Sequence, residues 1–263
     1  MRIPVRPSDQ FFLLLALLSV MACESKSPTG PRTDPLYPTV AAPLSPDSLA
    51  SRKLEFASAN PRICSSLNEY GFTGGSGLLC TTGSQGIGPD ADVDQLIKIA
   101  KGTISKNWRF TGVVDSSHLE LHNALLSPGI LRVNFSKQMY EGFLVERTWI
   151  AALMDSVGVL SLSGNHYQDI YIPAPKISAQ SAQTSILGMT LKWYDWHGPH
   201  TYVIAWDDLC QEPVRVVLPE ETDAGIELRV AWKIPVGCDH PRWYVYTDTM
   251  RGDSLYVYDT IIF

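Results

Sequence analysis

The sequence lacks the signatures of catalytic and metal sites. It contains no HExxH motif and no CxxC pair, and the spacings of its five cysteines fit no zinc knuckle. It also lacks an excess of basic residues, because 21 Lys and Arg stand against 27 Asp and Glu, which gives a net charge of -6 and no basic surface for nucleic acid. We therefore expect no catalytic residue, no cofactor and no nucleic-acid partner.

The apolar run near the N-terminus is too short to cross a bilayer as a helix. Residues 11–21 (FFLLLALLSVM) have the length of a signal-peptide core, and Arg2 and Arg6 precede them. The following Ala22-Cys23 resembles the bacterial lipoprotein signal, in which the cysteine is lipidated and becomes the new N-terminus. We expect residues 1–22 to be a signal peptide and Cys23 to anchor the protein to a bacterial membrane, facing the periplasm or exterior of the cell envelope. The alternative is a plain secretory signal.

Residues 23–46 read as a tether between this anchor and the folded body. The segment contains Ser and Thr and six prolines, which favour an extended chain and build no core: Pro28, Pro31, Pro35, Pro38, Pro43 and Pro46. A lipid-anchored domain needs such a spacer to clear the membrane headgroups.

Four further cysteines predict disulfides in an exported chain. Cys64 and Cys80 lie in residues 47–89, a short helix followed by a stretch rich in Gly, Ser and Thr, and Cys210 and Cys238 lie near the C-terminus. Three pairings are possible. We favour the local one, Cys64 with Cys80 and Cys210 with Cys238.

The rest of the chain predicts an α+β fold of two modules, each a helix packed on an antiparallel sheet. The first helix is expected over residues 90–106, which carry an apolar stripe and an Asp92/Gln95 capping pattern, and the second over residues 178–187. Strands of the first module are expected near residues 108–114, 118–125, 130–138, 143–154 and 159–164. Strands of the second are expected near residues 190–196, 202–206, 214–218, 226–236, 243–248 and 254–262.

Two strand patterns suggest sites. Four tyrosines alternate with apolar residues on two strands joined by a glycine hairpin, so they are expected to form a cross-strand ladder on the face away from the helix: Tyr244, Tyr246, Tyr256 and Tyr258. This ladder is either a binding face or a surface packed against the other module. His118, Glu120 and His122 also alternate, which makes them a weak candidate for a metal or acid-base cluster, and the simpler interpretation is the polar face of a half-buried strand.

Short motifs at the join between the modules carry a resemblance to a known family. They are residues 138–143 (QMYEGF), 158–165 (GVLSLSGN), 177–179 with the helix around Ala182, and 243–248 (WYVYTD) followed by the glycine hairpin. In these motifs, residues 92–263 resemble the FTP and PepSY domains in propeptides of thermolysin-type and fungalysin-type metalloproteases. The resemblance implies cystatin-like modules, FTP-like over residues 90–172 and PepSY-like over residues 173–263, which chaperone or inhibit a protease.

The sequence departs from that family in three ways. The zinc motif is absent, no protease domain follows Phe263, and Gln180-Ser181 replaces an acidic pair. The expected function is therefore that of a non-catalytic envelope lipoprotein that binds a separate protein, a protease or another envelope protein. The alternative is a lipoprotein that binds a small ligand or an envelope polymer in the cleft between the modules, and an enzyme ranks third.

Overall fold

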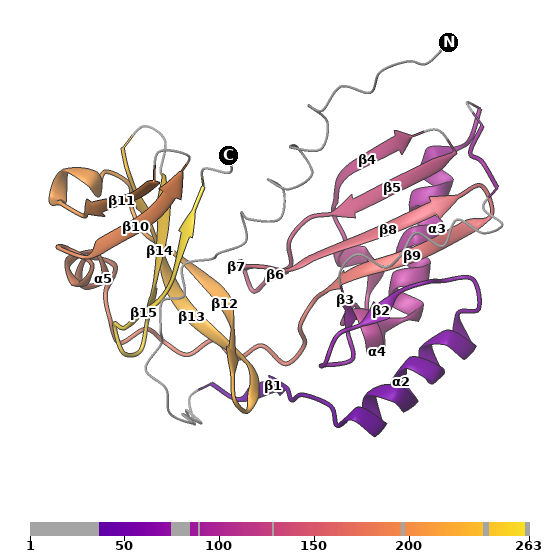
Figure 1. Ribbon diagram of the computed structural model, residues 1–263, viewed down its shortest axis with the longest axis horizontal. Helices are drawn as coiled ribbons and strands as arrows, with labels where there is room; N and C mark the ends of the chain where they lie inside the picture. Colours follow the sequence, from indigo (N-terminus) through magenta and orange to yellow (C-terminus); the bar gives the residue numbers. More distant parts are fainter. Residues whose placement is uncertain are drawn as a thin grey trace, which may run out of the picture.

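The protein is a mixed α+β chain that is rich in β-sheet (Figure 1). The computed structural model describes residues 37–74, 85–88, 90–127, 129–195, 198–238 and 242–260. Two sheets stand side by side in Figure 1, and the helix labelled α3 (Val93–Lys106) lies against the sheet at the right. No helix among these residues is long and apolar enough to span a membrane.

The first module is a four-stranded antiparallel sheet with one helix on it. Its strand order is β4-β5-β8-β9, where the strands are β4 (Leu121–Ser127), β5 (Ile130–Phe135), β8 (Trp149–Asp155) and β9 (Gly158–Asn165). Helix α3 (Val93–Lys106) begins three residues later than the predicted start at residue 90. Asp92 caps it as the capping pattern predicted, because its side chain accepts a hydrogen bond from the Gln95 N–H at 3.0 Å. The apolar stripe of α3 packs with Leu131, Val133, Ile150 and Met154 of the sheet.

The segment after α3 was predicted as a strand and is a helix. Trp108–Thr111 form the short helix α4, which ends at Gly112 with a φ of 73°. The aromatic and β-branched residues in this stretch suggested a strand. Tertiary packing decides otherwise, since the Phe110 ring meets the Phe56 ring edge-on at 4.9 Å. Ser116–His118 then form a 3-10 turn, η1, so the strand expected from residue 118 begins only at Leu121.

The second module is built on a larger sheet. In the described residues this sheet has seven strands, including the antiparallel run β12 (Val214–Thr222), β13 (Gly225–Val236), β14 (Trp243–Asp248) and β15 (Ser254–Asp259). Helix α5 (Ala179–Ser185), capped by Ser178, and the hairpin of β10 (Thr190–Asp195) and β11 (Gly198–Val203) cover one face. The core on that face includes Ala182, Ile186, Ile234, Trp243 and Val245.

The strand predicted over residues 143–154 is divided between the two sheets. Residues Phe143–Val145 form β7, which pairs with β6 (Met139–Tyr140) and runs parallel to β12 in the second module. After Glu146, Arg147 and Thr148 the chain enters β8 of the first module. The predicted module boundary at residue 172 therefore does not separate the sheets, because β6 and β7 precede it in sequence yet belong to the second sheet.

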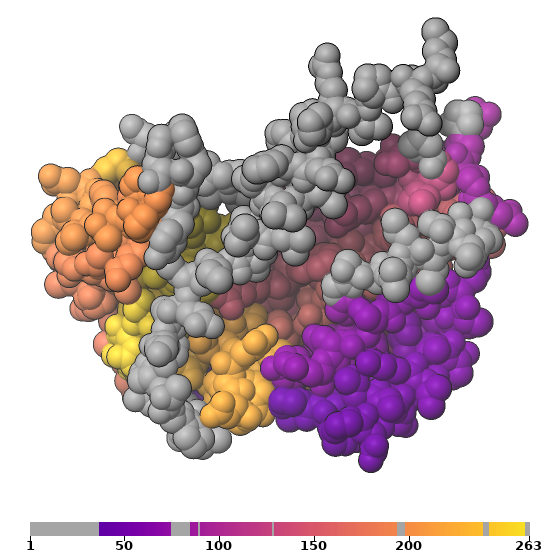
Figure 2. Space-filling model, in the orientation of Figure 1, coloured from indigo at the N-terminus to yellow at the C-terminus, as the bar shows by residue number. Residues whose placement is uncertain are grey.

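The end of the predicted tether belongs to the fold. The Tyr37 side chain is buried and donates a hydrogen bond to Asp248 Oδ1 at 3.1 Å, and β1 (Thr39–Ala41) pairs with β13. Helix α2 (Pro46–Ala59) then packs through Phe56 on the first module, beside the small hairpin of β2 (Ser66–Leu67) and β3 (Thr73–Gly74). Figure 2 shows this indigo segment against both the orange and the magenta parts of the surface. The tether prediction is therefore wrong for residues 37–46, and residues 23–36 lie outside the described residues.

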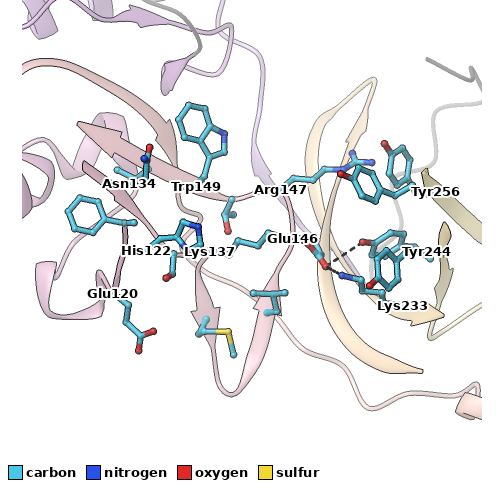
Figure 3. A pocket seen from close by; sticks show the side chains of 18 residues that line it. Glu120, His122, Asn134, Lys137, Glu146, Arg147, Trp149, Lys233, Tyr244 and Tyr256 are labelled. Atoms are coloured by element: carbon cyan, nitrogen blue, oxygen red, sulfur yellow. Dashed lines mark hydrogen bonds and ion pairs between the residues drawn. The ribbon is translucent and has the colours of Figure 1, made fainter. Parts of the chain in front are cut away.

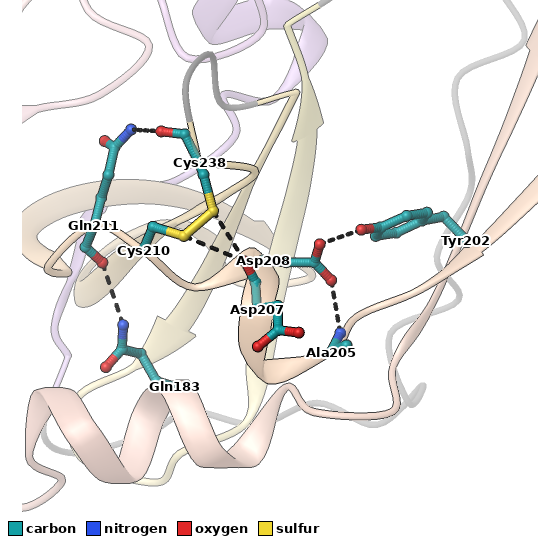
Figure 4. Close-up of a disulfide and its surroundings, with 8 residues drawn as sticks. All are labelled: Gln183, Tyr202, Ala205, Asp207, Asp208, Cys210, Gln211 and Cys238. Atoms are coloured by element: carbon teal, nitrogen blue, oxygen red, sulfur yellow. Dashed lines mark hydrogen bonds between the residues drawn. A yellow bond between two sulfur atoms is a disulfide. The ribbon is translucent and has the colours of Figure 1, made fainter.

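One predicted disulfide is confirmed. Cys210 and Cys238 are bonded, with a Cα–Cα distance of 5.1 Å, and both sulfur atoms lie near the carbonyl oxygen of Asp207 in the 3-10 turn η2 (Trp206–Asp208) (Figure 4). Cys64 is also disulfide-bonded, and Cys80, its predicted partner, lies outside the described residues. Cys23 and the signal peptide lie outside them too.

Candidate functional site

A groove of about 860 Å3 lies between the two sheets. Its lining comes from β4, β5 and β8 on one side and from β13, β14 and β15 on the other. Figure 3 shows His122, Lys137 and Trp149 on the first side, Lys233, Tyr244 and Tyr256 on the second, and Glu146 and Arg147 between them. The residues where the chain crosses from one sheet to the other thus form the middle of the groove.

All four tyrosines of the predicted ladder line this groove. Tyr244 is directly opposite Tyr258 and Tyr246 is directly opposite Tyr256 across β14 and β15. Trp243 and Val245, which alternate with them, face α5 instead. The four side chains differ in exposure, since Tyr246 is 4% exposed and Tyr258 is 40% exposed. Tyr246 therefore belongs to the structural base of the groove, whereas Tyr258 presents its ring to solvent.

A buried carboxylate holds the middle of the groove together. Glu146 is 3% exposed, and its two oxygen atoms accept hydrogen bonds from Lys137 Nζ at 2.5 Å and Lys233 Nζ at 2.7 Å. Burial by itself would raise the pKa of Glu146, but the two ammonium groups outweigh it and hold the pKa below the ordinary value. Glu146 is therefore ionised at neutral pH and ties β13 of the second module to the residues that precede β6.

The Tyr246 hydroxyl completes this network. It donates to Glu146 Oε1 at 3.3 Å. Burial raises the pKa of the Tyr246 phenol, and the nearby carboxylate raises it further, so the hydroxyl keeps its proton. Lys233 Nζ also lies 4.2 Å from the ring centre of Tyr244. The tyrosine ladder and the crossing segment are thus joined by one set of polar contacts.

Arg147, the next residue, has a left-handed backbone. Its φ is 56°, a conformation that costs a residue with a Cβ about 1 to 2 kcal/mol and that glycine adopts freely. Its neighbours are held on both sides, because Glu146 N–H donates to the Val217 carbonyl at 2.8 Å and Thr148 Oγ1 accepts from Gln138 N–H at 2.9 Å. The exposed side chain places its guanidinium carbon 3.8 Å from the ring centre of Tyr256.

The first-module wall carries a second exposed aromatic residue and two of the predicted metal candidates. Trp149 is 42% exposed, and Glu120 and His122 line the same groove. His118 does not join them, because it lies in the 3-10 turn η1 before the strand, and a register shift between Leu121 and Asn123 breaks the alternation further. In the described part of the chain no group of three possible metal ligands exists. The predicted three-residue cluster is therefore not formed.

Sequence reasoning missed most of the polar residues of the groove. Lys137 lies nine positions before Glu146, but Lys233 lies 87 positions after it, and nothing in the local patterns indicates that the three side chains meet. Arg147 is a local signal, because it interrupts the apolar alternation of Phe143, Val145 and Trp149 at the point where the chain passes from one sheet to the other. Together these residues offer stacking surfaces and cationic groups, which suits the groove to holding another molecule without covalent chemistry.

Comparisons with known proteins leave the family open. No family model matches the chain, and no curated protein matches it. A solved structure with some likeness is the Bacillus megaterium YpeB C-terminal domain, at 13% sequence identity and a TM-score of 0.33, covering 83% of this chain and 98% of that chain.

Proposed function

We propose that the protein is a non-catalytic binding protein whose groove holds an extended segment of another protein. The observation that carries this proposal is the lining of the groove, where Tyr244, Tyr256 and Tyr258 of the second sheet face Trp149 of the first. Tyr and Trp are enriched at the energetic centres of protein interfaces, because they bury a large apolar area with few rotatable bonds. Arg147 and Lys233 add cationic groups beside these rings.

The exposure of the lining favours an extended partner. Trp149, Met139 and Tyr258 are 42%, 56% and 40% exposed, so large apolar side chains are accessible on both walls. Exposed aromatic and methionine side chains gathered in one concave surface are typical of sites that bind other proteins. A segment of polypeptide lying along the groove would cover all three.

The setting of this activity is part of the proposal. We infer that Cys23 is lipidated and that the protein acts in the cell envelope, separated from the membrane by the residues before Tyr37. The resemblance of the short sequence motifs to the FTP and PepSY propeptide domains supports a role as a peptidase inhibitor or chaperone. In this role the groove would bind a protease or another envelope protein.

A second candidate is the binding of a small ligand or an envelope polymer in the same groove. The observation in its favour is the volume, since about 860 Å3 falls within the range of small-molecule sites. The two candidates differ in what a cross-link from the groove would capture.

The test is site-specific photo-crosslinking from the groove in cells. A photoreactive phenylalanine at position 258 or 149 is expected to yield a protein adduct, whereas the same group at Tyr171 or Trp108, which are 54% and 47% exposed outside the groove, is expected to yield none. An adduct that carries only a small molecule or a glycan supports the second candidate. Equal adducts from all four positions, or none from the groove, would refute the proposal.

A further inference from the structure

We propose that the groove recognises an acidic segment, in which a carboxylate of the bound polypeptide pairs with the guanidinium group of Arg147. This inference rests on the proposed function and adds the chemistry of the partner. It draws on three observations: the charge of the groove, the conformation of Arg147, and the position of its side chain over Tyr256.

The groove is positive although the chain is negative. The chain carries a net charge of -6. Three lining residues are positive (Lys137, Arg147 and Lys233) and two are negative (Glu120 and Glu146). With His122 counted as neutral, the formal charge of the lining is 3 - 2 = +1. Because opposite potentials attract across interfaces, a groove of this sign favours a negatively charged partner.

Arg147 is the cation in this set that the fold leaves available. Lys137 and Lys233 both bind the single carboxylate of Glu146. Within the described ranges Arg147 forms no ion pair and no hydrogen bond, and its guanidinium group lies over the Tyr256 ring. Burial raises the pKa of Glu220, and the charges of Arg229 and Arg147 partly oppose that rise. Glu220 nevertheless forms no ion pair with Arg147 in the described part of the chain. A guanidinium stacked on a ring keeps its N–H edge free for a carboxylate.

The backbone at position 147 supports a role for the side chain. Glycine would fit a φ of 56° without strain, and the flanking hydrogen bonds of Glu146 and Thr148 hold the crossing in place whatever residue stands between them. Strain of this kind gathers at functional sites. The side chain of Arg147 is therefore expected to matter to binding more than to folding.

A carboxylate has the geometry to pair with the exposed Arg147 side chain. The guanidinium is planar and pairs with a carboxylate through two parallel N–H···O bonds. The rings of Tyr256 and Tyr258 lie on the same strand beside it, so an apolar or aromatic residue next to the acidic one in the partner would have a surface to cover. The expected motif is an acidic residue next to an apolar or aromatic one.

The experiment is a selection of random twelve-residue peptides on the full chain from residue 23, with Cys23→Ser to keep it soluble. Selected peptides are expected to be enriched in Asp and Glu. Replacing the acidic residue of a peptide by Asn or Gln should weaken its binding to the wild-type protein about tenfold or more. Arg147→Gln should weaken binding of the acidic peptide by a similar factor and should change binding of the amide peptide little. Arg132→Gln, at an exposed arginine outside the groove, is the matched control.

Stability measurements separate binding from folding. Arg147→Gly should abolish the preference for acidic peptides while leaving the melting temperature unchanged or higher. A different result is that Tyr258→Ala weakens the selected peptides and yet they show neither an acidic preference nor a dependence on Arg147. That result overturns this inference and leaves the proposed function standing. Failure to select any peptide sensitive to Tyr258→Ala, or Arg147-dependent binding of an anionic glycan alone, overturns both.

Discussion

Replacement of Glu146 by Gln is expected to destabilise the protein substantially. The carboxylate is buried, and Lys233, one of its two partners, has a side chain that is 17% exposed. Removing one partner of a buried pair costs about 3 to 5 kcal/mol because the other charge is left without compensation. The ring of Tyr244 beside the Lys233 ammonium reduces that penalty by about 1 kcal/mol. The partner Lys137 is 47% exposed, and such a pair contributes about 1 kcal/mol at most.

These contributions together give a loss of about 3 kcal/mol on Glu146→Gln. For a chain of this size each kcal/mol lowers the melting temperature by about 2 to 4 °C, so a fall of about 6 to 12 °C is expected. Urea unfolding followed by tryptophan fluorescence measures the free energy of unfolding directly. Lys137→Met is the control and should lose about 1 kcal/mol or less, because nearly half of the Lys137 side chain is exposed and Lys233 still compensates the charge of Glu146.

The double variant Glu146→Leu with Lys233→Met sharpens the test. It removes both buried charges, so it should be more stable than Glu146→Gln alone. The difference between wild type and Glu146→Gln should also depend on pH. Since the folded-state pKa of Glu146 is below its ordinary 4.5, the stabilisation is complete above about pH 5 and is lost as pH falls through the folded-state pKa. If Glu146→Gln and Lys137→Met lose the same small amount, the network does not join the two modules as described.

Three further predictions concern other parts of the chain. His166 is buried, which lowers its pKa from 6.5 to about 4, so between these values the unfolded chain binds a proton that the folded protein does not. As the pH falls from 6.5 to 4, this residue should lower the free energy of unfolding by about 1.4 kcal/mol per pH unit. Urea unfolding at a series of pH values should show a shallower fall in His166→Phe. Gly112→Ala should lower the melting temperature by several degrees in calorimetry, because its Cβ would lie 1.9 Å from the His166 carbonyl oxygen. The control Gly188→Ala is also at positive φ but has open space around it, so its free energy of unfolding should fall by only about 1 kcal/mol. Mass spectrometry of the mature N-terminus should find a lipid on Cys23, and processing elsewhere or an unmodified Cys23 would exclude the lipid anchor.

Several elements could be predicted because their determinants lie within a few residues of one another. Helix α3 follows from its apolar stripe and from Asp92 at its start. Strand β14 begins and ends at the predicted residues, and tyrosines alternate with Trp243 and Val245 over its first four positions. The same period-2 rule put the four tyrosines on one face before any partner strand was known. The Cys210–Cys238 bond could be predicted from the expectation that the chain is exported and from the separation of 28 residues between the two cysteines.

The middle of the groove could not be predicted, because its residues meet only through tertiary structure. Nothing local to residues 143–154 distinguishes one long strand from two short strands in different sheets, and the pairing of β7 with β12 joins residues more than seventy positions apart. Glu146 is a buried network centre only because Lys233 and Tyr246 reach it from the other sheet. The sequence pattern likewise places Tyr37 in a proline-rich spacer, and only the fold shows that its hydroxyl donates a hydrogen bond to Asp248. Sequence by itself determined the periodic elements, the ladder and one disulfide, since those depend on neighbouring residues; the groove depended on which distant segments packed together, which only the three-dimensional arrangement decides.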